Sequence, residues 1–118
     1  MSGDGRSRRG RRQSAELTRL RAEIDELDRR IVSLLNERAE LTRAVVHEKA
    51  ALGRRRIRDR EREREVLLRI SMANIGPIPQ ADLLAIYRRL IASARALEAL
   101  ELERLRRDDE GPSEPPGA

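Results

Sequence analysis

The feature that most constrains this chain is a stretch of residues 14–52 that contains neither Gly nor Pro. Its apolar residues recur at steps of three and four, the spacing of an amphipathic helix. At about 1.5 Å per residue, this helix is nearly 60 Å long. A compact domain of this size has a radius of gyration of only about 13–14 Å, so one subunit cannot bury it. We expect Ser14 as the N-cap and Gly53 as the stop. The apolar positions are Leu17, Leu20, Ile24, Leu27, Ile31, Leu34, Leu41 and Val45.

Two further helices are expected after this one. Asp59 can cap a second helix that ends near Asn74, and a third helix runs from about Gln80 to about Leu105. Residues 76–79 (GPIP) separate them. The fold class is therefore all-α, with a long, a short and a long helix. Because these helices cannot close a core alone, we predict an intertwined helical homodimer. A long coiled coil is the alternative explanation.

The composition agrees with helices and excludes several kinds of site. Aromatic residues make up 1% of the chain and charged residues 40%, which suits charged helices with an apolar stripe better than a sheet. There is no Cys, and His47 is the one His, so disulfides, thiolate nucleophiles and a His-ligated metal are not expected. No apolar run matches a membrane span or a secretory signal. We expect a cytoplasmic protein without metal or cofactor.

Both ends of the chain differ from the helical domain predicted over residues 14–106. Residues 1–13 form a basic arm and residues 107–118 an acidic, Pro-rich tail, and we expect both to be disordered. The arm could bind nucleic acid or an acidic partner. A solvated tail is the favoured interpretation, since no aromatic residue is interleaved to stack on bases. The arginines of the arm are Arg6, Arg8, Arg9, Arg11 and Arg12.

Charged residues interrupt the apolar stripes. Arg38 fills the gap between Leu34 and Leu41, and Lys49 follows eleven residues later, about three helical turns on, so both point the same way. Inward-facing cations are costly without anions. The structural alternative is that their stems extend past the core or pair with neighbouring glutamates.

The two later helices show the same pattern. Arg62 and Glu63 begin the inward face of the second helix, and Glu98 lies on the apolar side of the third, where partial burial would raise its pKa. If these residues converge, the cavity is small, strongly cationic and without a nucleophile or metal. It would suit a small dicarboxylate and a reaction that needs only positioning and charge stabilisation.

At these residues the chain resembles a chorismate mutase of the all-helical class, the type II family. The resemblance covers nearly all of residues 17–101. It implies an intertwined dimer that converts chorismate to prephenate for phenylalanine and tyrosine synthesis, by a cofactor-free pericyclic rearrangement. The stretches that carry it are residues 20–28 (LRAEIDELD), 34–41 (LLNERAEL), 48–49 (EK), 58–63 (RDRERE), 76–79 (GPIP), 86–91 (IYRRLI) and 93–98 (SARALE).

The resemblance also implies roles for the residues of the long helix. Each site is assembled across the dimer, so Arg21 reaches in from the partner chain and helps Arg38 to hold the two carboxylates of the substrate. Lys49 donates to the ether oxygen, on which negative charge builds as its C–O bond breaks.

The other two helices complete the implied site. Glu63 accepts a hydrogen bond from the ring hydroxyl near the backbone of Asp59, and Arg62 completes the cationic wall. Ala94 stands where the family often has Ser, so a hydroxyl contact to a carboxylate is missing. Glu98 stands where some members have Gln, and it would have to be protonated to donate to the ether oxygen.

Two other functions remain open from the sequence. An isochorismate pyruvate-lyase of the same fold would use a similar cationic pocket, although Arg62, Glu63 and the third-helix ending favour the mutase. A non-catalytic helical dimer whose basic arm binds nucleic acid or a protein would leave Arg38 and Lys49 salt-bridged or solvated. As a mutase, a chain this short would act alone or dock on another shikimate-pathway enzyme.

Overall fold

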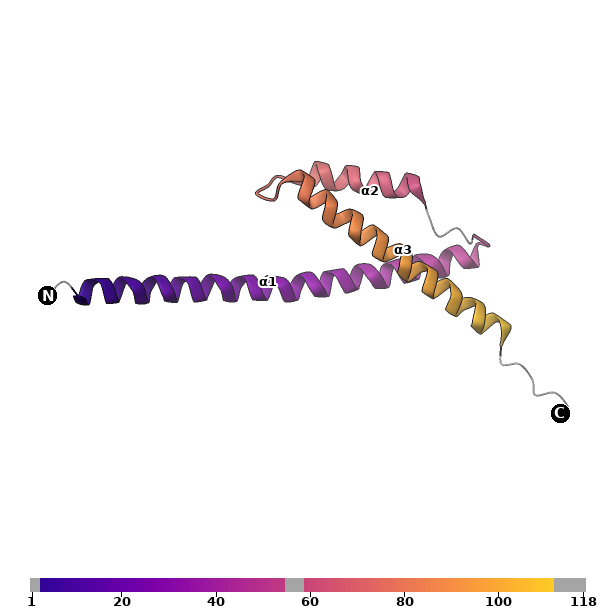
Figure 1. Cartoon of the computed structure of the whole chain (residues 1–118). Coiled ribbons are helices and arrows are strands. Elements are labelled where there is room, and N and C mark those ends of the chain that lie inside the picture. Colours follow the sequence, from indigo (N-terminus) through magenta and orange to yellow (C-terminus); the bar gives the residue numbers. More distant parts are fainter. Residues whose placement is uncertain (1–2, 55–58, 112–118) are drawn as a thin grey trace, which may run out of the picture. The chain divides into compact units, whose positions relative to one another are not determined.

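The structure is a computed structural model that describes residues 3–54 and 59–111, with side chains from residue 8 onward in the first range. All the regular structure in these ranges is helical: α1 (Gly3–Ala51), α2 (Arg60–Ala73) and α3 (Gln80–Glu110) (Figure 1). The predicted all-α class and the order long, short, long are confirmed. The chain divides into two compact units, Met1–Arg38 and Ala39–Ala118.

The first unit is the N-terminal part of α1, and this helix begins earlier than predicted. It starts at Gly3 instead of Ser14, and the Thr18 hydroxyl donates to the Ser14 carbonyl at 2.8 Å, so Ser14 lies inside the helix and is not its cap. Residues 3–13, expected in a disordered arm, are part of α1. The physical reason is that each residue added to an existing helix gains one hydrogen bond while only that residue is fixed, so extension is much easier than starting a helix. Arginine is also a good helix former.

Local ion pairs cover the outer face of α1 in the first unit. Arg19 pairs with Glu16 and, at 3.1 Å, with Glu23, and Arg29 pairs with Glu26 at 2.7 Å. All five side chains are exposed, so each pair stabilises the helix only weakly.

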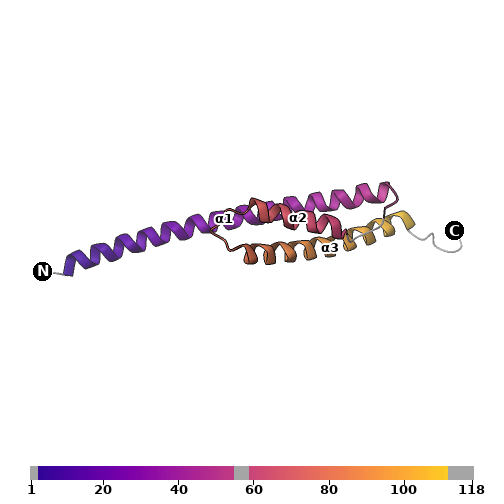
Figure 2. The ribbon, with the colours of Figure 1, turned by 90° about the horizontal axis from the view of Figure 1, so that it is seen from above.

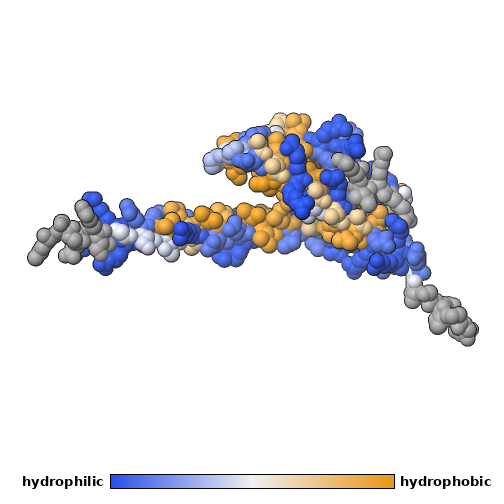
Figure 3. All heavy atoms as spheres, viewed as in Figure 1, coloured by the Kyte–Doolittle hydropathy of each residue, from blue (hydrophilic) through white to orange (hydrophobic). Residues whose placement is uncertain are grey.

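The apolar stripe of the first unit is exposed in the single chain. Its large side chains keep between 43% and 59% of their surface open to solvent, and Figure 3 shows apolar atoms along this helix. Among residues 8–38, whose side chains are described, all are exposed except Arg38, which is half-buried. A continuous apolar stripe of this length indicates a surface that another helix covers. The six side chains are Leu17, Leu20, Ile24, Leu27, Ile31 and Leu34.

The C-terminal end of α1 lies in the second unit and stops at the predicted residue. Gly53 has a φ of 75°, a left-handed conformation that glycine adopts without steric cost. The Gly53 amide donates to the Ala50 carbonyl at 3.0 Å, and the Arg54 amide donates to the Lys49 carbonyl at 2.7 Å. These two bonds form a Schellman motif, which satisfies carbonyl groups at the helix end. The following loop residues, 55–58, lie outside the described residues.

The start of α2 and the turn before α3 also follow the sequence prediction. Asp59 caps α2, and its carboxylate accepts from the amide of Arg62 at 3.0 Å. In the turn, the Asn74 side-chain amide donates to the Ile78 carbonyl at 3.1 Å and to Gln80 at 2.7 Å. These contacts return the chain, so that α3 packs against α2 (Figures 1 and 2).

The core of the second unit is small. Its buried apolar side chains within the described ranges are Val46 of α1 and Ile91 and Leu102 of α3. Helix α3 continues to Glu110, five residues beyond the predicted end at Leu105, so the first residues of the predicted acidic tail are helical. Residues 112–118 of that tail lie outside the described residues. No helix within the described ranges has the length and apolar character needed to span a membrane.

Candidate active site

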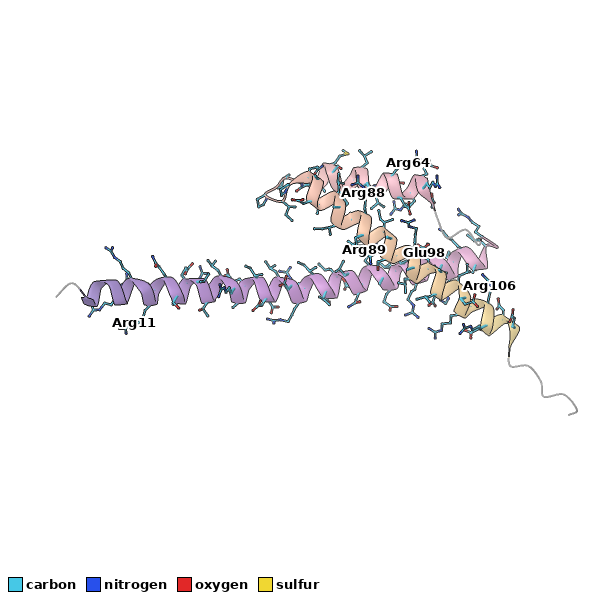
Figure 4. The ribbon with its side chains drawn as sticks, in the orientation of Figure 1. Arg11, Arg64, Arg88, Arg89, Glu98 and Arg106 are labelled. Carbon is cyan, nitrogen blue, oxygen red and sulfur yellow. The ribbon has the colours of Figure 1, made fainter. Side chains whose placement is uncertain are left out.

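The second unit holds six of the residues that the sequence predicted for the site. Lys49 is half-buried in the last turn of α1. Ala94 and Glu98 are half-buried on α3, where Figure 4 labels Glu98. The remaining three lie at the N-terminus of α2, where the helix dipole adds positive potential. They are Asp59, Arg62 and Glu63.

Asp59 and Arg62 make local contacts at the start of α2. The Asp59 carboxylate is engaged as the helix cap. The Arg62 guanidinium donates from Nη1 to Glu65 at 3.2 Å, and both side chains are exposed. These contacts keep Arg62 along its own helix. Its role in a cationic wall therefore remains a prediction that requires the side chain to turn toward a ligand.

Glu63 is more enclosed than its neighbours and contacts α3. Its Oε1 atom lies 3.1 Å from Nε of Arg95, with side-chain exposures of 19% for Glu63 and 35% for Arg95. Arg95 was not among the site residues predicted from the sequence. The available signal was its position, three residues before Glu98 on the same helix and one residue after Ala94.

Glu101 forms a second link, between α3 and the end of α1. Its carboxylate, buried at 7% exposure, lies 2.7 Å from Nε2 of His47 and 3.2 Å from Nε of Arg43. The hydrogen bond from His47 is the main cause that lowers the pKa of Glu101. Burial opposes this shift, and Arg43 adds to it. The contact between Glu101 and His47 was not predicted from the sequence.

Arg21 and Arg38 belong to the first unit. Arg21 is exposed, whereas Arg38 is half-buried. Lys49 and the predicted residues of α2 and α3 therefore belong to one unit, and the two arginines belong to the other. No group of three potential metal ligands is found among the residues that the structure describes.

The family model of chorismate mutase type II matches residues 20–99. The chain belongs to this family. The resemblance seen in the sequence is therefore confirmed. The chorismate mutase match includes α1 from residue 20 onward, all of α2 and the part of α3 that carries Arg95 and Glu98.

Two relatives of the chorismate mutase region are bifunctional proteins. The chain is 42% identical over 89 residues to a bifunctional chorismate mutase/prephenate dehydratase of Aquifex aeolicus (strain VF5). The matched region covers 70% of this chain and 24% of that protein. It is 33% identical over 90 residues to a protein of the same description from Stutzerimonas stutzeri. This match covers 73% of the chain and 25% of the relative. The chain thus spans about a quarter of the length of the curated relatives that it matches.

Proposed function

We propose that this protein is a chorismate mutase, which rearranges chorismate to prephenate without a cofactor. The observation that carries the proposal is the family match over residues 20–99, because every proposed site residue, from Arg21 to Glu98, lies inside it. The curated relatives have chorismate mutase in their printed names. The proposed activity belongs to phenylalanine and tyrosine biosynthesis.

The proposed reaction needs charge stabilisation more than acid–base chemistry. A C–O bond breaks as a C–C bond forms in one pericyclic step, so no proton and no covalent intermediate is required. Negative charge develops on the ether oxygen, and Lys49 donates to it. Glu98, when protonated, provides a second donor from α3. Fixed donors aimed at developing charge lower the barrier because they need no reorganisation during the reaction.

Binding of the substrate requires cations for its two carboxylates. We assign this role to Arg38 and to Arg21 of a second copy of the chain. A second copy is supported by the exposed apolar stripe of the first unit and by the small core of the second. Two copies would bury each other's stripes in an isologous dimer. Each long helix would then hold Arg38 for its own site and deliver Arg21 to the other site.

Ala94 modifies this binding scheme. Its methyl group cannot donate a hydrogen bond, whereas the Ser that is frequent in the family can. Ser93 does not replace it, because adjacent residues on a helix point about 100° apart and Ser93 is exposed. The arginines therefore carry more of the carboxylate binding here, and Ala94→Ser should lower KM.

The experiment that tests the proposal follows the loss of chorismate absorbance after purified protein is added. We expect turnover to prephenate above the uncatalysed rate. Isochorismate is the parallel substrate, and faster release of pyruvate from it would favour the lyase of the same fold. No turnover of chorismate by a folded dimer would refute the mutase.

A further inference from the structure

Three ionisable residues follow one another at steps of three on α3: Arg95, Glu98 and Glu101. The outer two are tied to different helices, Arg95 to α2 through Glu63 and Glu101 to the end of α1. Glu98, the proposed donor to the ether oxygen, lies between these two links. This arrangement suggests that α3 organises the site as well as supplying Glu98 to it.

The contact between Arg95 and Glu63 is unusual in its geometry. The Nε and Oε1 atoms are 3.1 Å apart, and the Arg95 Nε atom is fully buried yet makes no directed hydrogen bond. The pair is therefore held by charge at this atom. Breaking a partly buried pair by removing one partner is costly, because the remaining charge has lost both its water and its counterion.

An anionic side chain beside a dianionic substrate needs a specific reason. Glu63 would repel both substrate carboxylates unless its charge is offset, since charges a few ångströms apart interact strongly away from bulk water. A nearby guanidinium offsets that charge and limits the rotation of the carboxylate. An ionised carboxylate held in this way accepts a strong, charge-assisted hydrogen bond from a hydroxyl group.

We propose that Arg95 is a positioning residue that holds the Glu63 carboxylate in the orientation in which it accepts a hydrogen bond from the ring hydroxyl of the substrate. This inference rests on the proposed mutase function and on the role given there to Glu63. It makes Arg95 a determinant of specificity for a hydroxylated ring, acting through Glu63 without contacting the reacting atoms.

The test compares the variants Arg95→Met, Arg95→Lys and Glu63→Gln in steady-state kinetics. Arg88→Met is the matched control, because Arg88 is exposed on the same helix (Figure 4). We expect Arg95→Met to raise KM by about 10- to 100-fold, the range for a hydrogen bond to a charged group, with a smaller change in kcat. Arg95→Lys should restore part of the loss, and Arg88→Met should resemble the wild type.

A double-mutant cycle and a substrate analogue separate positioning from a merely structural link. Glu63→Gln combined with Arg95→Met should be no worse than the poorer single variant, because both act on one contact. With an analogue that lacks the ring hydroxyl, Arg95→Met should raise KM by a smaller factor than with chorismate, because the oriented carboxylate then has no hydroxyl to accept. The analogue can also be compared between wild type and Arg95→Lys, should the Met variant fail to fold.

Three results would overturn the inference. They are an unchanged KM in folded Arg95→Met, additive effects in the cycle, or an equal loss with the analogue, which would show that Arg95 binds another part of the substrate. These results differ from failure of the proposed function, in which the wild-type protein itself would not consume chorismate and the positioning role would fall with it.

Discussion

The Nε2 atom of His47 lies 2.7 Å from the Oε1 atom of Glu101 and joins the last turns of α1 to the C-terminal half of α3. Arg43, one turn earlier on α1, contacts the other carboxylate oxygen at 3.2 Å. Lys49 follows His47 by two residues, and Glu98 precedes Glu101 by three. The buried carboxylate thus ties together the two helices that carry the groups proposed to donate to the ether oxygen.

Glu101 should make the fold sensitive to acid. Its pKa is lowered from its ordinary value of 4.5, mainly by the hydrogen bond from His47. A lowered pKa in the folded state contributes stability above the unfolded pKa, and this contribution is lost as pH falls through the folded pKa. We expect the melting temperature to fall below about pH 4.5 and the variant Glu101→Gln to show a flatter dependence. Thermal unfolding followed by circular dichroism at a series of pH values measures both.

Glu103→Gln is the matched control for this prediction. Glu103 lies on the same helix and is exposed, and it contacts only arginines of its own helix in the described ranges, at 3.8 Å. Exposed pairs of this kind contribute little, so its unfolding profile should match that of the wild type. An equal loss of acid sensitivity in both variants would contradict the role of Glu101.

Arg38 should be essential for turnover. Removing one preorganised group that stabilises charge typically costs about 10²–10³ in rate, so we expect Arg38→Ala to lose at least about a hundredfold in kcat/KM. Arg30→Ala serves as the control, because Arg30 is exposed on the same helix and outside its apolar stripe. A rate for Arg38→Ala close to that of Arg30→Ala would exclude Arg38 from the site.

Mixing two inactive variants tests whether Arg21 acts in the partner's site. In a dimer of one Arg21→Ala chain and one Arg38→Ala chain, one of the two sites keeps both arginines. Random exchange of subunits gives half mixed dimers, so about a quarter of the wild-type activity should return. Activity is measured before and after the variants are unfolded and refolded together. If none returns although mixed dimers form, then both arginines belong to the same chain's site.

The extent of sequence prediction differs between α2 and α1. The Asp59 cap, the glycine stop at Gly53 and the GPIP turn were predicted because each depends on a few neighbouring residues. The start of α1 was placed eleven residues late, because Ser14 has the residue type of a cap but lies inside a helix that simply continues. Residue preference cannot distinguish a helix that starts at Ser14 from one that continues through it, because adding a residue to an existing helix changes the free energy very little.

The candidate site shows the same division. The half-buried positions of Lys49 and Glu98 followed from helical periodicity, since a stripe places residues on a face. The pairing of Glu63 with Arg95 and of His47 with Glu101 did not follow, because it depends on how α1, α2 and α3 pack side by side. Periodicity identifies the face of each helix and leaves the register between helices undetermined.

Glu98 should give the reaction a pH dependence. A carboxyl group donates a hydrogen bond only when protonated, so activity should fall as pH rises through the titration of Glu98. Glu98→Gln carries a permanent donor of similar size and should flatten the pH–rate profile. The measurement is kcat/KM across a pH series for both proteins, and identical profiles would show that Glu98 does not donate in the rate-limiting step.

The basic start of α1 should be dispensable for catalysis. Residues 1–13 precede the matched region, and the described arginines among them, Arg8, Arg9, Arg11 and Arg12, are exposed. Deleting residues 1–13 leaves Ser14 at the start of α1, where its side chain can act as a cap. We therefore expect an unchanged kcat/KM and a melting temperature within a few degrees of that of the full chain.

The same deletion tests whether the basic segment has a separate role. Electrostatic binding to nucleic acid weakens steeply with salt, because neutralised phosphates release their counterions. Binding of the full chain to a DNA duplex is measured at low and moderate salt, with the deletion variant as the comparison. Salt-sensitive binding lost on deletion, with mutase activity intact, would assign nucleic-acid binding to this segment. A loss of mutase activity in a folded, dimeric deletion variant would instead show that the segment contributes to the active site.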